Sequence, residues 1–339
     1  MKDNTNIPVN HQVLQWARES IAMTRNQASE KTGISAWRLA QLEEGEKPPT
    51  LDELSEFSKA YKRTIATLLL NNPPKEKPLP QDRRTVDSAE LGILHVKTIM
   101  AVRKARALAQ SYLELKLEFN IGVPRFRIYT TTKDQPKEVA ALVRKELKLH
   151  ELRGFVNLNH ALDGYIEKIE SLGVAVFQLS LTQDKLRGFS IVDEALPIIV
   201  IKRGGETPTA KIFTLFHELG HLILNQGGLC DMSEKTDMEI EKWCNSFAAG
   251  LRSLLENGLT TSQFYKEKHR VWNKPSFGRA KNPEGRDLAK ESITERGRTY
   301  ISLAFSAFDQ NRIDIKDLSD FLGIKLAYIQ KTRQLFSAY

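Results

Sequence analysis

The sequence offers little that would point to secretion or to a membrane. Two cysteines in 339 residues cannot build a disulfide framework, and the first twelve residues lack the apolar core of a signal peptide. The longest apolar runs fall far short of the ~20 residues that a membrane helix needs. The composition, with 41% hydrophobic and 27% charged residues, is that of a globular protein. We therefore expect a cytoplasmic protein without membrane contact.

Acidic residues are also fewer than basic ones: the chain has 42 Asp and Glu against 50 Lys and Arg, which gives a net charge of +8. A basic balance predicts a polyanionic partner such as double-stranded DNA. The surplus is unevenly spread: residues 1–72 are neutral and 119–260 carry −1, whereas 73–118 carry +3 and 261–339 carry +6. If nucleic acid binds, we expect these side chains to help hold it: Lys266, Lys268, Arg270, Lys274, Arg279 and Lys281.

The pattern along the chain predicts an α+β protein in four parts. Residues 1–72 read as a domain of short helices, and residues 73–118 as a proline-rich linker followed by helix. Residues 119–260 mix helices with strands at 173–179, 188–192 and 197–202, the last two paired as a hairpin. Residues 261–339 form a basic helical segment, with helices expected at 294–309, 314–321 and 326–336, that echoes a helix-turn-helix.

Residues 217–221, which read His-Glu-Leu-Gly-His, carry the clearest chemical signal. On a helix His217 and His221 project from one face about 5–6 Å apart, so two imidazoles can ligate one Zn²⁺. Glu218, the residue after His217, is rotated about 100° around the helix from that histidine. Its carboxylate can therefore exchange a proton with a metal-activated water without ligating the metal. The apolar surroundings predict that both histidines are buried, where a metal would satisfy them. The alternative is a surface histidine pair with a helical glutamate.

A catalytic zinc needs a third protein ligand and one open position. The next predicted helix offers Glu241, which lies beside its apolar stripe, whereas Glu239 should point to solvent. Cys244 could also ligate, although a small buried thiol at a stripe position favours a core role. Cys230 and Asp231 in the connecting loop are weaker alternatives. We therefore predict a metal site of His217, His221 and Glu241.

The strand before the motif helix could hold a substrate. A zinc peptidase often presents an open strand edge, to which a peptide adds through main-chain hydrogen bonds. The strand that starts at Pro197 fits because proline is tolerated at edges. The predicted edge-strand residues are Ile198, Ile199, Val200 and Ile201. The alternative is an interior strand of a small sheet.

Two segments, TLFHELGHLIL and EIEKWCNSFAAGL, resemble the ImmA/IrrE family of metallopeptidases. The second matches the E-x-x-A-N-x-F-A-A signature of that family, with Cys244 in place of the usual alanine. The resemblance implies a minimal zincin fold, a gluzincin-like zinc held by His217, His221 and Glu241, and Glu218 as general acid and base. Such proteins occur in bacteria, phages and mobile elements, where they cleave a partner repressor, often of the Xre type, and so derepress stress or excision genes.

The N-terminal part resembles an Xre/Cro-type helix-turn-helix. The resemblance is carried by Ala28, Gly33, Ile34, Ser35, Leu39, Leu42, Glu43 and Gly45. The recognition helix of such a module enters the major groove, so we predict DNA contacts from Ala36, Trp37, Arg38 and Gln41, with Arg38 on guanine and Gln41 on adenine. Because residues 1–72 have no net charge, protein docking is the alternative role.

These observations favour a zinc-dependent endopeptidase that cleaves a transcriptional repressor or antitoxin, with an N-terminal DNA-binding-type module. The alternative is a non-proteolytic DNA-binding regulator, or a toxin–antitoxin component, whose zincin domain only senses or binds a partner. The intact Glu218 favours the enzyme, because a retired site has no need of a proton carrier. No residue stands out as a stabiliser of the oxyanion.

Overall fold

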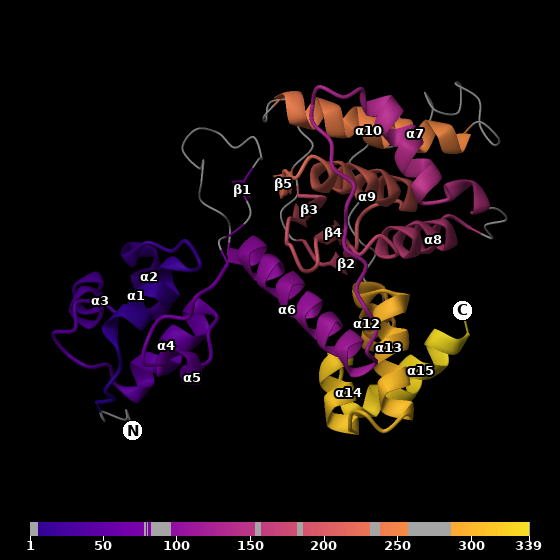
Figure 1. The fold of residues 1–339 in the computed structure, drawn as a ribbon. Coiled ribbons are helices and arrows are strands. Elements are labelled where there is room, and N and C mark those ends of the chain that lie inside the picture. The colour runs from indigo at the N-terminus through magenta and orange to yellow at the C-terminus, as the bar shows by residue number, and fades with distance from the viewer. Residues whose placement is uncertain are drawn as a thin grey trace. The chain divides into compact units, whose positions relative to one another are not determined.

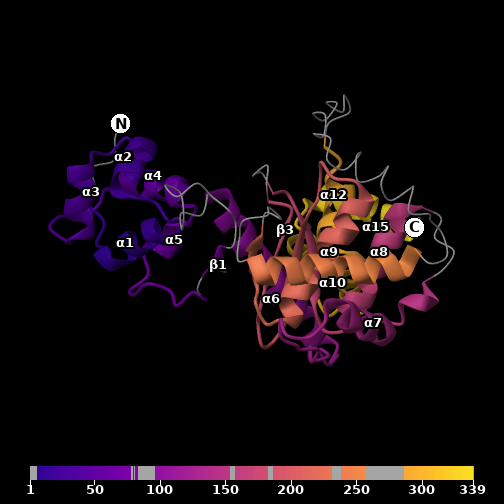
Figure 2. The same ribbon diagram turned by 90° about the horizontal axis from the view of Figure 1, so that it is seen from above.

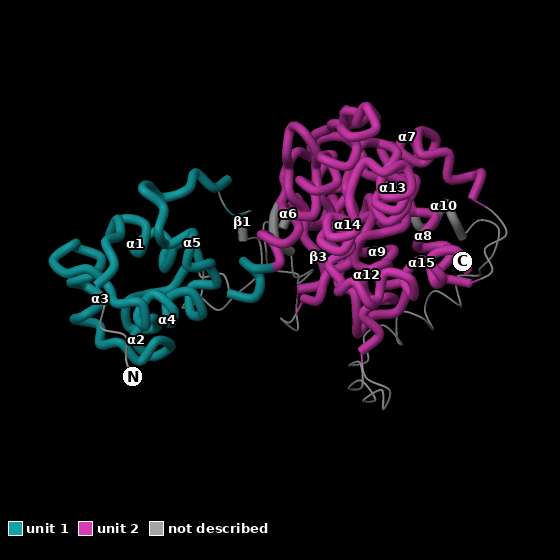
Figure 3. Tube along the Cα trace, turned by 90° about the horizontal axis from the view of Figure 1, so that it is seen from below, with its two compact units in different colours: residues 1–79, 90–100 teal, residues 80–89, 101–339 magenta. Residues whose placement is uncertain are grey.

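The computed structural model describes residues 6–77, 79, 81–82, 96–152, 157–181, 186–230, 238–256 and 286–338. The chain divides into two compact units (Figure 3). Unit 1 comprises residues 1–79 and 90–100, and unit 2 comprises residues 80–89 and 101–339. Helical units combined with a small mixed sheet confirm the predicted α+β class. The six basic side chains between Lys266 and Lys281 lie outside the described residues.

Unit 1 is a bundle of short helices whose ends are fixed by local hydrogen bonds. Thr24 and Thr50 each begin a helix with a capping box, and Gly33, in the left-handed conformation at φ 72°, ends the second helix. Apolar side chains at helical spacing, such as Val13 and Leu54, fill its core. The described helices of this unit before residue 90 are α1 His11–Glu19, α2 Arg25–Thr32, α3 Ala36–Glu43, α4 Leu51–Tyr61 and α5 Ile65–Leu68.

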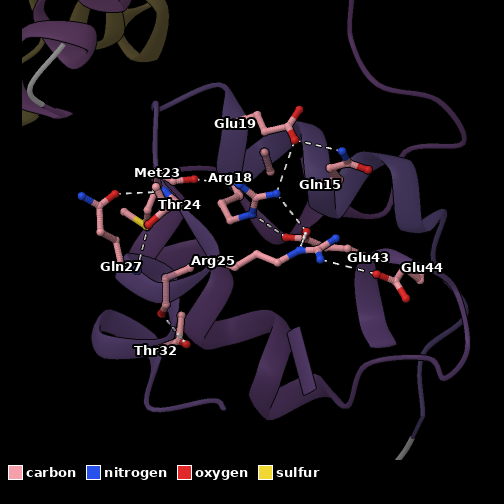
Figure 4. Close-up of polar contacts among 12 residues, drawn as sticks. Gln15, Arg18, Glu19, Met23, Thr24, Arg25, Gln27, Thr32, Glu43 and Glu44 are labelled. Carbon is pink, nitrogen blue, oxygen red and sulfur yellow. Dashed lines mark hydrogen bonds and ion pairs between the residues drawn. The ribbon is translucent and has the colours of Figure 1, made fainter. Parts of the chain in front are cut away.

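A buried ion cluster joins the first three helices of unit 1 (Figure 4). Arg18 Nε and Nη2 bind the two carboxylate oxygens of Glu43 at 2.6 and 2.9 Å, and Arg25 Nε binds Glu43 Oε2 at 2.8 Å. Burial alone would raise the pKa of Glu43, but the two arginines hold it below its usual value. Two of the four arginines of residues 1–72 therefore hold the fold together.

Unit 2 is organised around a mixed sheet with the strand order β1-β5-β3-β4-β2. Strands β3 and β4 pair in antiparallel register from Gly188–Ile201 to Ile191–Ile198, which confirms the predicted hairpin. On its other side β4 pairs in parallel with β2. The strands are β1 Gln81–Asp82, β2 Ala175–Leu179, β3 Gly188–Ile191, β4 Ile198–Lys202 and β5 Gly228–Cys230.

The edge-strand prediction for Ile198, Ile199, Val200 and Ile201 is wrong. These residues form most of β4, whose main chain is occupied by β3 on one side and β2 on the other. The interior position also explains why all four side chains are buried. A substrate therefore cannot add to β4 without displacing a neighbouring strand.

Helices cover this sheet and place the motif helix at the centre of unit 2. Helix α9 Pro208–Ile223 contacts β3, β4, α8 Leu158–Glu170 and α10 Met238–Glu256. Figures 1 and 2 show α9 between the sheet and α10, with α7 Pro136–Glu146 beside α10. The remaining elements before the C-terminal group are α6 Val96–Glu118 and the short 3-10 helix η1 Leu149–Glu151.

Four helices and a 3-10 turn close the chain. Where the sequence predicts one helix over 294–309, Gly297 at φ 80° separates two. These elements are α12 Leu288–Arg296, α13 Arg298–Asp309, α14 Ile315–Leu322, η2 Leu326–Tyr328 and α15 Ile329–Ser337. They are tied to the sheet by Arg203, the residue after β4, which pairs with Glu291 and Glu295 at 3.3 Å each. None of the helices that the structure describes is long and apolar enough to cross a membrane.

Glu170 of α8 forms a second contact with the C-terminal helices, and this contact depends on pH. The Thr299 hydroxyl donates to Glu170 Oε2 at 2.6 Å, and burial raises the pKa of Glu170 to about 8. The folded state therefore holds this proton more tightly than the unfolded chain does. The resulting stability is complete below about pH 4.5 and falls by ~1.4 kcal/mol per pH unit until about pH 8.

Glu170→Gln removes this titration while keeping an acceptor for Thr299. Urea denaturation of unit 2 gives the free energy of unfolding of the variant and of wild type at each pH. We expect the value for the variant minus that for wild type to be a few kcal/mol larger at about pH 8.5 than at about pH 5. A difference that is the same at both pH values would show that Glu170 does not titrate between them.

Candidate metal centre

Helix α9 is built to bury its polar motif. Thr207 caps it by accepting a hydrogen bond from the Ala210 amide at 3.3 Å, and Pro208 occupies its first turn. Apolar side chains surround the motif, and every residue from Thr214 to Ile223 is buried. The helical spacing places His217 and His221 on one face, where both are fully buried as the sequence predicts.

The third donor comes from α10, which lies against that face. His217 Nε2 lies 3.2 Å from Glu241 Oε2, His221 Nε2 lies 3.3 Å from Glu241 Oε1, and the two Nε2 atoms are 3.1 Å apart. Three donors held ~2.0–2.1 Å from one tetrahedral zinc would lie about 3.3 Å from one another. The three side chains thus have the spacing that a single zinc ion requires.

The environment of Glu241 also suits a cation. Glu241 is 4% exposed. Burial alone would raise the pKa of Glu241, but the two histidines lower it below its usual value. Among the residues that the structure describes, this is the one group of three His, Cys, Asp or Glu side chains placed to hold a metal ion. The donor set of two imidazoles and one carboxylate is that of catalytic zinc sites.

Glu218 lies beside this donor set but takes no part in it. Both of its carboxylate oxygens are buried, and neither makes a hydrogen bond of normal geometry with a described residue. Burial raises the pKa of Glu218 well above its usual value, the Ser190 hydroxyl of β3 lowers it, and the charge of Glu241 raises it. A buried carboxyl group without a structural partner is positioned to exchange a proton with a ligand.

Two residues that frame Glu218 were not predicted. A Cβ atom at Gly188 of β3 would lie 3.2 Å from Glu218 Oε1 and 2.7 Å from Thr214 Cγ2, so the glycine allows β3 to lie close to α9. Ser190, two residues along the same strand, is buried beside the carboxylate. A single glycine or serine in a short strand carries no periodic signal, so sequence reasoning had no pattern by which to find either.

Gly220 lets α10 approach the motif. A Cβ atom there would lie 3.2 Å from both Cys244 Sγ and Phe247 Cδ1 of α10. Cys244 is fully buried at this contact, which places it in the core rather than among the three donors. The close contact of the two helices brings Glu241 within reach of the histidines.

Gly220→Ala should therefore move α10 by a few tenths of an ångström and weaken zinc binding about 10–100-fold, as changes around metal ligands do. Competition with a chromophoric chelator measures the affinity. Gly122→Ala is the matched control, because a Cβ atom there meets nothing within 4 Å. Equal zinc affinity in the two variants would contradict the close-contact role of Gly220.

Two of the four predicted DNA contacts of unit 1 have side chains that the structure engages or buries. Arg38 is held by Glu53, with Nε and Nη2 at 2.9 and 3.0 Å from its two carboxylate oxygens, and Gln41 is 9% exposed. Readout of guanine by Arg38 and of adenine by Gln41 therefore disagrees with the structure. Trp37 is 69% exposed, and contacts from Trp37 and Ala36 stay a prediction.

Comparison with known families matches both parts of the chain. Residues 169–252, which include α9 and most of α10, match the family described as the IrrE N-terminal-like domain, Peptidase_M78. Residues 14–68 match a helix-turn-helix family. No curated protein matches the chain, and no solved structure does. One part of the chain is therefore similar to a helix-turn-helix family and another to the IrrE-like domain of a metallopeptidase family, the combination that the sequence predicts.

Proposed function

We propose that the chain is a zinc-dependent endopeptidase whose zinc is held by His217, His221 and Glu241. The observation that carries this proposal is the spacing of 3.1–3.3 Å among three buried donors, with a second buried carboxylate, that of Glu218, outside the donor set. The metallopeptidase family match at residues 169–252 supports it independently.

The division of labour follows from the site. A bound zinc ion supplies a Lewis acid that polarises the peptide carbonyl and lowers the pKa of water. Glu218, whose carboxyl group has no structural partner, takes a proton from the attacking water and returns it to the leaving amine. Ser190 of β3 lies buried beside Glu218 and lowers its pKa, and Gly188 keeps the space beside its carboxylate open.

We propose a helix-turn-helix transcriptional repressor or antitoxin as the substrate. A peptidase domain implies a protein substrate, and its fusion to a helix-turn-helix domain implies a role near DNA. Within this proposal the helix-turn-helix of unit 1 locates the enzyme on DNA or on the substrate.

The proposal is tested by incubating the zinc-loaded full chain with helix-turn-helix repressors from its own genome and mapping new termini by mass spectrometry. Cleavage at one site by wild type, and none by Glu218→Gln, is the expected result. Equal cleavage by both chains, or no cleavage by a fully zinc-loaded wild type, would refute the peptidase and leave a non-proteolytic regulator.

A further inference from the structure

The C-terminal end of unit 2 repeats the geometry of the helix-turn-helix in unit 1. Helices α2 and α14 both begin at a capping box, formed by Thr24 and Asp314, and both end nine residues later at a left-handed glycine. These glycines, Gly33 and Gly323, have φ angles of 72° and 60°. In unit 1 the helix α3 begins three residues after the glycine, and in unit 2 the 3-10 turn η2 begins at the same distance and leads directly into α15.

The buried positions repeat in the same register. Five residues before the glycine lies a fully buried side chain, Ala28 in unit 1 and Leu318 in unit 2. The second helices place buried residues six and nine positions after the glycine, and these are Leu39, Leu42, Ile329 and Thr332. A shared turn and a shared core pattern indicate the same motif, although the helix-turn-helix family match covers residues 14–68 alone.

The second helices of the two motifs differ in charge. In unit 1 the helix and the turn after it carry Glu43, Glu44 and Glu46. Residues 324–338 carry three basic residues, Lys325, Lys331 and Arg333, and no acidic one. A positive reading helix suits the phosphate backbone of a duplex, which dominates the affinity of DNA-binding proteins.

The outer face of this element is exposed. Lys325, Ala327, Gln330 and Gln334 are exposed, and Leu326 is 53% exposed. Figure 1 shows α14 and α15 at the end of unit 2 opposite α7 and α10. Arg333 serves the fold instead, because it binds Asp309 at 2.5 Å and lies over the Phe305 ring.

Lys331 is also available to a ligand. Its side chain is 53% exposed and pairs with Asp287 at 3.1 Å. An exposed pair of this kind contributes little stability, so a phosphate can replace the aspartate at small cost.

We infer that residues 314–337 form a second helix-turn-helix that binds duplex DNA, with η2 and α15 as its reading element. Lys325 and Lys331 contact phosphates at the edges of the groove, and Leu326 and Ala327 contact thymine methyl groups. The site belongs to the same unit as the metal centre and does not depend on peptidase activity.

The test uses the full chain and a fluorescent mixed-sequence duplex of about two helical turns. Fluorescence anisotropy between about 50 and 200 mM salt gives the affinity and its salt dependence. Lys325→Gln combined with Lys331→Gln should weaken binding about tenfold or more and reduce the logarithmic salt slope by about 1.8, or 0.9 for each lost phosphate contact.

Two further variants keep the result interpretable. The control variant combines Lys133→Gln, just before α7, with Lys145→Gln, within α7; both positions are exposed, and the change of charge is the same. This control should bind DNA nearly as well as wild type does. Ala327→Glu places a carboxylate on the exposed reading face and should weaken binding at least as much as the double lysine variant does, without changing the melting temperature. The inference is overturned if the wild type does not bind the duplex, or if both C-terminal variants bind it as well as the Lys133/Lys145 control.

Discussion

Glu218→Gln should eliminate peptide-bond cleavage and leave the zinc content of the protein unchanged. Glutamine has the shape of the buried carboxyl group but cannot accept a proton from water, so general-base and general-acid steps are both lost. Proton transfer by a positioned side chain contributes about 10²–10⁴-fold to a rate, and kcat/KM should fall by at least that much. Zinc should remain because Glu218 is not among the three grouped donors.

The measurement is kcat/KM on the cleaved repressor, or on a peptide spanning its scissile bond, together with zinc content by mass spectrometry. Glu239→Gln is the matched control, since it makes the same chemical change at an exposed position on α10. If Glu218→Gln retained activity within tenfold of that control, Glu218 would not be the proton carrier.

His217→Ala should cost the protein most of its zinc and its metal-dependent stability. The remaining pair of His221 and Glu241 offers two donors, and a structural or catalytic zinc site requires at least three from the protein. A ligand present at 1,000 times its dissociation constant stabilises the folded state by ~4 kcal/mol. The variant forfeits that stabilisation and also leaves the buried Glu241 carboxylate with one histidine instead of two.

Thermal unfolding with and without a chelator measures this loss. The chelator should lower the melting temperature of wild type and of His160→Ala, which removes an exposed histidine of α8, but not that of His217→Ala. A zinc stoichiometry near one in His217→Ala would exclude His217 as a ligand.

The grouping of His217, His221 and Glu241 was predictable because it depends on the spacing of residues within single helices. The spacing of His217 and His221 within one helix fixes their common face, and helical periodicity within α10 singles out Glu241 over Glu239. The same reasoning gave the β3–β4 hairpin, whose strands follow each other in the chain.

The predictions that failed depend on partners far along the chain. The main chain of β4 is covered on one side by β2, which arrives from before β3, and no pattern within Ile198 to Ile201 reveals that neighbour. The side chain of Arg38 is captured by Glu53 of another helix, so an isolated view of the recognition helix leaves it free for DNA. Pairing between elements, rather than periodicity, decides these two cases.

X-ray absorption at the zinc edge of the purified full chain tests the metal centre most directly. The structure predicts one zinc per chain with nitrogen and oxygen neighbours at ~2.0–2.1 Å and no sulfur, because Glu241 rather than Cys244 completes the site. A sulfur neighbour at ~2.3 Å would place Cys244 or Cys230 on the metal. That result, or a chain that binds no zinc, would contradict the site of His217, His221 and Glu241.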